Sequence, residues 1–181
     1  VVRPVALRVA FVESGDVAIK TLFSEEFAPV KTGQTLAIGS ELRTGPEGFA
    51  ELELEGNIIR LNQNTEIRLR DNQAGESAFL GDPEIPRLAF ELASGNVWLN
   101  ARDPIAVGTA RTRAVFTESV GSYIYADGLS QIQVVTGMAD LKWNDDQGAA
   151  LTAYLLPLGH QVWFYDRQIT SAYRQIHPSK L

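Results

Sequence analysis

The sequence predicts an all-β protein, and three features of the chain support this fold class. Apolar and polar residues alternate with a period of two in many short segments, which is typical of half-buried strands. Gly, Asn and Asp residues, which favour turns, recur at intervals of about 8 to 12 residues. Few windows show the spacing of a helix. Strands of about five residues joined in this way suit a β-sandwich or a β-helix-like solenoid.

The segment from Leu42 to Leu69 shows the alternation most clearly. In residues 50–55 Ala and Leu alternate with Glu, and in residues 65–70 Thr, Ile and Leu alternate with Glu and Arg. Because successive side chains of a strand point to opposite faces, we expect the apolar set to face the core. The predicted core residues of this segment are Leu52, Leu54, Ile59, Leu61, Ile67 and Leu69.

Two turns divide this segment into three predicted strands. Gly56 and Asn57 tolerate positive φ and are predicted to form the tight turn between the first two strands. The polar run at residues 62–64 breaks the alternation again. A three-stranded meander would place a row of Glu beside a row of Arg, and we interpret that row as a solvated face with cross-strand ion pairs.

Further short strands are predicted along the chain. They lie at Val17–Ile19, Val97–Leu99, Tyr123–Tyr125, Ile132–Val135, Met138–Trp143 and Gln161–Tyr165. Residues 71–87 are polar and interrupted by Gly and Pro, which predicts a long surface loop.

The end of the chain departs from the β pattern. Ile169, Ala172, Tyr173 and Ile176 have helical spacing, and Pro178 follows as a suitable stop. We therefore predict an all-β domain over residues 1–165 and an extension over residues 166–181 that contains one short helix.

Composition excludes several classes of partner. The chain has 181 residues, a formal net charge of -6 and no Cys. Nonspecific affinity for nucleic acid comes from clustered Lys and Arg, so we expect no nucleic-acid partner. Without Cys there are no disulfides and no zinc-thiolate sites. No stretch approaches the roughly 20 apolar residues of a membrane span, so membrane association is expected only through a segment absent from this chain.

The sequence shows no catalytic or metal-binding signature. His160 and His177 lie far apart and form no pattern that places two imidazoles on one metal, and we interpret His160 as a solvated turn residue. Neither a nucleophile elbow nor a phosphate-binding loop is present. We favour solvation over a calcium ion for the carboxylates that gather at Asp71, Glu76, Asp82, Glu84, Asp145 and Asp146, because their spacing matches no calcium loop. We expect no enzymatic activity and no cofactor.

Two tryptophans are candidates for a binding surface. Trp98 lies on the opposite face of its strand from its two apolar neighbours, which predicts an outward position beside Asn96 and Asn100. Trp163 lies in a strand that is apolar on both faces. We expect that strand to be buried on both faces, with ligand binding as the alternative.

A series of short motifs recurs in a fixed order along the chain. Its segments are Gly15–Val17, Gly33, Gly39–Gly45, Ala50–Asn57, Gly95–Leu99, Gly121–Tyr125, Val134–Leu141 and Leu158–Gln161. This series resembles the FecR domain family, which shows a glycine-led strand, then "G-x-x-L-x-x-G-D-x-L-R-T" and "A-x-L-x-L-x-D-G-S" segments, followed by further glycine-led strands. The resemblance covers roughly Val5 to Phe164.

The resemblance implies a non-catalytic bacterial interaction domain in the periplasm or at the cell surface. It implies an envelope protein as the partner, in signalling or scaffolding. Family members that relay signals to a sigma factor also have an inner-membrane helix and an anti-sigma segment, which we do not find in this chain. The alternative is a module that binds an envelope glycan such as peptidoglycan. It would use Trp98 or Trp163 as a stacking platform, with Asn96 and Asn100 bound to sugar hydroxyls.

Overall fold

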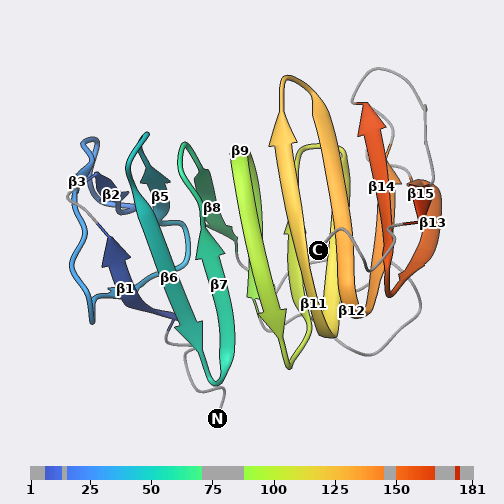
Figure 1. Ribbon diagram of the computed structural model, residues 1–181. Coiled ribbons are helices and arrows are strands. Elements are labelled where there is room, and N and C mark those ends of the chain that lie inside the picture. The colour runs from blue at the N-terminus through green and yellow to red at the C-terminus, as the bar shows by residue number, and fades with distance from the viewer. Residues whose placement is uncertain (1–6, 14–15, 71–87, 145–149, 166–173, 176–181) are drawn as a thin grey trace, which may run out of the picture.

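The computed structural model describes residues 7–13, 16–70, 88–144, 150–165 and 174–175. Within these ranges the chain forms 15 strands and no helix, and every strand belongs to one mixed sheet. The sheet folds back on itself, so that β2, β5 and β8 lie behind β1, β6 and β7 (Figure 1). The prediction of an all-β fold is confirmed, and its architecture is a sheet doubled into two layers.

Each layer is a row of hydrogen-bonded strands, antiparallel except for the parallel pair β9–β10. The first layer contains, in order, β4 (Thr35–Leu36), β1 (Leu7–Glu13), β6 (Phe49–Leu54), β7 (Asn57–Leu61), β9 (Leu88–Ala101), β11 (Thr112–Ala126), β12 (Leu129–Asn144), β14 (His160–Tyr165) and β15 (Arg174–Gln175). The second layer contains, in order, β3 (Ala28–Pro29), β2 (Val17–Lys20), β5 (Glu41–Thr44), β8 (Glu66–Arg70), β9, β10 (Ile105–Gly108), β11, β12 and β13 (Ala150–Pro157).

Three long strands, β9, β11 and β12, run through both layers. In β9, for example, residues 89–94 pair with β8 of the second layer, and residues 97–100 pair with β7 of the first. The ladder of β11 and β12 shifts register near Glu118 and Gly137, which both have positive φ. A Cβ on Gly137 would meet the carbonyl oxygen of Glu118 at 2.4 Å, so the strands bend where glycine permits close approach.

These long strands correct the expected strand lengths. The predicted strands Ile132–Val135 and Met138–Trp143 are two parts of β12, and the strand predicted at Tyr123–Tyr125 is the end of β11. Gly137 has positive φ at a bend inside β12. A glycine with positive φ also suits a turn between two strands, so the sequence alone does not distinguish one bent strand from two short ones.

The hydrophobic core lies between the layers. All six predicted core residues are buried, with exposed fractions of 3% or less. The β9, β10 and β11 strands add large inward side chains, among them Phe90, Ile105 and Phe116. The period-two alternation therefore identified the inner face correctly in both layers.

The β6–β7 hairpin turns at Glu55 and Gly56, with Leu54 paired to Asn57 across it. Both turn residues have positive φ, 48° and 88°, as a two-residue type I′ turn requires. The assignment of Gly56 to the turn is confirmed. The assignment of Asn57 is wrong, because Asn57 begins β7 and is fully buried.

Buried Asn57 joins the hairpin to the loop after β9. Its Oδ1 accepts hydrogen bonds from the backbone N–H groups of Arg102 and Asp103, at 2.7 and 2.9 Å. Its Nδ2 donates to the carbonyl of Leu54 at 2.8 Å and to the Asp103 carboxylate at 3.2 Å. Asn57 therefore has a structural role that depends on the hydrogen bonds of its side chain and not on tolerance of positive φ.

The expected three-stranded meander is wrong. β7 pairs with β9 in the first layer, whereas β8 pairs with β5 and β9 in the second. The chain changes layer at residues 62–64, where Thr65 exchanges hydrogen bonds with the backbone of Asn96. As a result, Arg68 and Arg70 pair with Glu41 and Glu91 and not with the Glu row of β6.

Two further predictions fall largely outside the described residues. Of the predicted C-terminal helix only Arg174 and Gln175 are described, and they form β15 against β14, which corrects the helix at that point. The rest of the 166–181 extension and the predicted loop at 71–87 lie outside the described ranges. In the described part of the chain, no helix has the length and apolar character needed to span a membrane.

Candidate functional site

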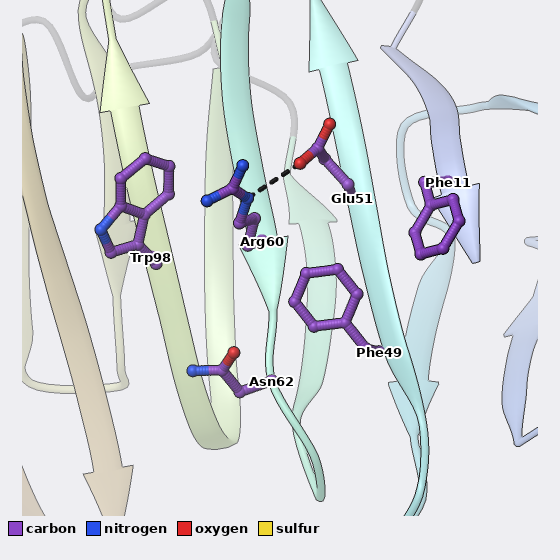
Figure 2. A pocket seen from close by; sticks show the side chains of 6 residues that line it. All are labelled: Phe11, Phe49, Glu51, Arg60, Asn62 and Trp98. Atoms are coloured by element: carbon purple, nitrogen blue, oxygen red, sulfur yellow. Dashed lines mark hydrogen bonds and ion pairs between the residues drawn. The ribbon is translucent and has the colours of Figure 1, made fainter. Parts of the chain in front are cut away.

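A shallow hollow of about 510 Å³ lies on the outer face of the first layer, over β1, β6, β7 and β9. We call it the aromatic hollow; Figure 2 shows the side chains that line it, which are Phe11, Phe49, Glu51, Arg60, Asn62 and Trp98. The strand register brings them together, because Glu51 lies opposite Arg60 and Arg60 lies opposite Trp98.

Arg60 lies between Trp98 and Glu51. Its Nε donates to the Glu51 carboxylate at 2.8 Å, and its guanidinium carbon lies 4.6 Å from the centroid of the Trp98 ring. The ion pair is half-exposed, so it contributes about 0.2 to 1 kcal/mol. The cation–π contact adds about 0.5 to 1 kcal/mol at such a site. Both contacts hold a long side chain in one orientation on an open surface.

Phe11 and Phe49 form the other side of the hollow. Their ring centroids are 6.4 Å apart and the rings are tilted by 58°. Leu7 and Val9 of β1 point into the core, and strict alternation would send Phe11 inward as well. The register shift between Val9 and Phe11 inserts one extra residue and turns Phe11 outward, where it is 49% exposed. A β-bulge therefore places this ring on the surface.

The outward position predicted for Trp98 is confirmed. Asn96, Trp98 and Asn100 alternate with buried Val97 and Leu99, and all three are partly exposed on the outer face of β9. Arg60 occupies one side of the Trp98 ring, so that ring is only partly open to a ligand.

Trp163 lies on the same outer face, on β14. It is partly exposed while its neighbour Val162 is buried, so the expectation that this strand is buried on both faces is wrong at Trp163. Trp163 pairs with Gln131 of β12 and not with any residue of the aromatic hollow. The structure therefore brings Trp98, Asn96 and Asn100 together and places Trp163 apart from them.

Uncharged side chains cover the outer face between the two tryptophans. At the described positions that the strand register pairs within the first layer, the outward residues of β9, β11, β12 and β14 include no Asp, Glu, Lys or Arg. Charge borders this surface at one edge, where Arg102 and Glu118 line a hollow with Asn100. We call this surface the amide face, defined by Asn96, Asn100, Ser122, Ile124, Gln131, Gln133, Gln161 and Trp163.

The outer face of the second layer has the opposite character. We call it the charged face, defined by Lys20, Glu41, Arg43, Glu66, Arg68, Arg70, Glu91, Arg113, Asp140 and Lys142. Glu41 pairs with Lys20 at 3.0 Å and with Arg68 at 3.8 Å. Burial lowers the pKa of Lys142; Arg113 lowers it further and Asp140 opposes the change.

Of the six residues that line the hollow, the sequence indicates only Trp98 as a binding residue. It predicts Glu51 and Arg60 as part of a solvated row and Asn62 as part of a turn, and it gives no role to Phe11 or Phe49. The signal for Phe49 was its parity with Glu51, since alternate residues of one strand share a face. Phe11 gave no such signal, because its bulge is invisible in the sequence. Arg60 meets Trp98 only through the β7–β9 pairing, which joins distant parts of the chain.

The described residues offer little for metal chemistry. No group of three or more His, Asp or Glu side chains among them could hold a metal ion. His160 begins β14 and its Nδ1 lies 2.9 Å from the carbonyl oxygen of Leu158, a local contact beside the turn. His177 and the carboxylates considered for calcium lie outside the described residues.

Two crystal structures of a candidate anti-sigma factor from Parabacteroides distasonis have a similar fold. Both superpose with a TM-score of 0.58, at 16% and 14% sequence identity. The matches cover 77% of this chain and 61% of the solved chains, so this chain spans less than two thirds of the proteins it matches. No protein-family model matches the chain, and no curated protein is significantly similar in sequence. At this identity the likeness establishes the fold alone.

Proposed function

We propose that this domain is a non-catalytic docking module that binds a protein partner through the aromatic hollow. The observation that carries the proposal is the position of Arg60, held between Trp98 and Glu51 on an exposed sheet face. Trp and Arg are the residues most enriched at the energetic centres of protein interfaces, and aromatic rings are enriched there generally. The exposed Phe11 ring extends this surface.

The partner would gain most from covering the hollow completely. The Arg60–Glu51 pair and the Arg60–Trp98 contact are weak while they are exposed, and both strengthen when water is excluded. Arg60 is also oriented before binding, so little side-chain entropy remains to be lost. Two contacts that contribute little free energy on the open surface therefore hold Arg60 in the orientation that a partner would bind.

A role in signal transduction fits two independent likenesses. The solved structures of similar fold come from a candidate anti-sigma factor, and the motif order resembles the FecR domain family. On these grounds we assign the domain to bacterial envelope signalling or scaffolding, in the periplasm or at the cell surface. Labelling intact cells with a membrane-impermeant reagent tests this location, and labelling only after lysis would contradict it.

Capture with matched variants tests the docking function. Purified protein immobilised on beads is expected to enrich one partner from an envelope extract of the source bacterium. Arg60→Glu and Trp98→Ala should abolish that enrichment, while Arg68→Glu on the charged face should preserve it. All three positions lie on outer faces, so each variant should fold. Equal enrichment by the wild type and both hollow variants would refute a docking role for this surface.

A further inference from the structure

The amide face poses a question that docking at the hollow does not answer. A solvated sheet face of an acidic protein normally has charged side chains, as the charged face of this chain does. The described outward residues that the register pairs from β9 to β14 in the first layer have none, although the same strands bear Glu91, Arg113 and Asp140 where they enter the second layer. Because the same strands tolerate charged residues in the second layer, a general preference of strands for uncharged residues does not explain their absence from the amide face.

The register arranges this surface in two rows that cross the strands. One row reads Trp98, Ser122, Gln133, Gln161, and the next reads Asn96, Ile124, Gln131, Trp163. Neighbouring strands are about 4.8 Å apart, so β9 and β14, three spacings apart, are separated by about 14 Å. Amide and hydroxyl groups fill most of the space between a tryptophan at each end. The rows also contact each other, since Gln131 Nε2 donates to Gln161 Oε1 at 3.2 Å.

We propose that the amide face binds an uncharged polysaccharide, which lies across the strands with Trp163 as its stacking platform. An Asn or Gln amide can both donate and accept hydrogen bonds, and a serine hydroxyl can do the same, which matches the hydroxyl and acetamido groups of a sugar. Asn96 is the exception on this face, because its Oδ1 is buried and cannot accept from a surface ligand. An indole ring offers an apolar plane for the C–H face of a pyranose. The distance between the tryptophans calls for an oligosaccharide and not a single sugar.

The absence of charge decides which ligands fit. A nucleic acid or an anionic lipid surface needs clustered Lys or Arg, whereas the described charge at this surface is Arg102 beside Glu118 at the Asn100 edge, a pair of opposite sign. A protein interface of this size has an apolar core, whereas here amides and a hydroxyl separate Ile124 from the rings. A neutral sugar chain is the ligand class that needs polar groups of both kinds and no charge.

This site is distinct from the docking function and rests on different residues. Trp163, Gln133 and Gln161 lie on β12 and β14, away from Phe11, Phe49 and Arg60. Trp98 stands at the boundary, with one side of its ring occupied by Arg60. The two proposals can therefore fail separately. If both hold, the domain links a protein partner to a glycan.

Titration calorimetry with defined sugars tests the proposal. The probes are neutral hexasaccharides of N-acetylglucosamine, glucose and mannose, with the cationic glucosamine hexasaccharide as a control of equal length and different charge. At least one neutral probe should bind with an affinity that is the same at low and high salt. Trp163→Ala should weaken that binding about tenfold, the loss expected for one stacked ring. Gln133→Ala should weaken it less.

Two control variants keep the outcome specific. Arg43→Ala and Arg68→Ala, both on the charged face, should bind the neutral probe as the wild type does, and circular dichroism should show that Trp163→Ala keeps its strand content. Lack of binding by every neutral probe overturns the proposal, as does unchanged binding by Trp163→Ala or preference for the cationic probe. If Trp163→Ala loses the protein partner while no sugar binds, the amide face is a protein interface and the glycan site does not exist.

Discussion

The amide face and the charged face are built partly on the same three strands, β9, β11 and β12, yet charged side chains mark one face and amide side chains mark the other. Where these strands run in the second layer they have Glu, Arg, Asp and Lys, and the neighbouring strands supply ion-pair partners. Where they run in the first layer they have Asn, Gln, Ser, Trp and Ile124. Most of their inward residues are apolar in both layers, and the buried exceptions include Thr112, Ser119 and Ser130.

The inner and outer faces of the strands are under different physical requirements. The inner faces must be apolar to fill the space between the layers, and either layer meets that need in the same way. The outer faces are free of that need, so their composition reflects solvent or partner. The charged face has the composition expected of a surface in contact with water alone. The aromatic hollow and the amide face lack this composition, and the contacts proposed above with a protein partner and a glycan would account for the difference.

The largest effects should come from the shared core, where the layers are equivalent. Leu52→Ala in the first layer and Leu69→Ala in the second should each lower the free energy of unfolding by about 2 to 5 kcal/mol, because both side chains are buried and leave a cavity. Urea unfolding measures both. A cost below about 1 kcal/mol for only one of them would show that the layers do not share one core.

Two asparagines sharpen the contrast between interior and outer face. Asn57→Ala should cost about 2 to 3 kcal/mol, because Asn57 is fully buried and its hydrogen bonds are lost, including those from the part-buried N–H groups of Arg102 and Asp103. Asn100→Ala on the amide face should cost less than about 0.5 kcal/mol. Thermal melts of the two variants give the comparison, and equal melting temperatures would refute the structural role of Asn57.

The β6–β7 turn tests the register that aligns Glu51 with Arg60. Gly56 has a φ of 88°, so Gly56→Val forces a β-branched residue into the left-handed region and should cost about 1 to 3 kcal/mol. Glu53→Gln removes only the charge of a partly exposed ion pair with Arg8 and should cost less than about 0.5 kcal/mol. Denaturant midpoints measure the difference. Equal midpoints would show that this φ does not constrain the turn.

The charged face should contribute little to stability and nothing to binding. Glu41→Gln removes the contacts with Lys20 and Arg68 and should cost at most about 1 kcal/mol, since both pairs are partly exposed. That cost should shrink at high salt. Partner capture should be unchanged. Loss of the partner in this variant would reverse the roles assigned to the two faces.

The smallest effect is a pH dependence on the charged face. Burial lowers the pKa of Lys142, so within the window between its folded pKa and the ordinary lysine pKa the folded state releases this proton before the unfolded state does. The unfolded state then binds more protons, and stability rises with pH through that window. Lys142→Met should flatten this rise, and chemical denaturation at several alkaline pH values measures it. A steeper rise in the variant would contradict the assigned direction.

The fold class and the inner face were predictable because they depend on local periodicity. Leu52, Leu54 and Ile59 alternate with polar neighbours, and one buried side of a strand leaves that period in the sequence. The positive φ of Gly56 was predictable for a similar reason, since a two-residue hairpin demands it. The strand that pairs with another strand can lie far away in the sequence. No local pattern in the sequence therefore indicates that β8 belongs to the second layer.

The candidate site was only half predictable. The outward position of Trp98 followed from parity, as did its neighbours Asn96 and Asn100. Its contact with Arg60 depends on the β7–β9 pairing, and the position of Phe11 depends on one extra residue in β1. The prediction for Asn57 failed for a different reason. Asn is common in turns, but this Asn is a buried residue that forms hydrogen bonds.

Site-specific photo-crosslinking tests the central claim most directly, that the outer face of the first layer is the contact surface. A photoreactive amino acid is placed at positions 60 and 98 in the first layer and at positions 43 and 68 on the charged face, one at a time, in the full chain inside its native cells. The account predicts one shared crosslinked partner from positions 60 and 98 and none from positions 43 and 68. Crosslinks to that partner from the charged face alone would contradict it.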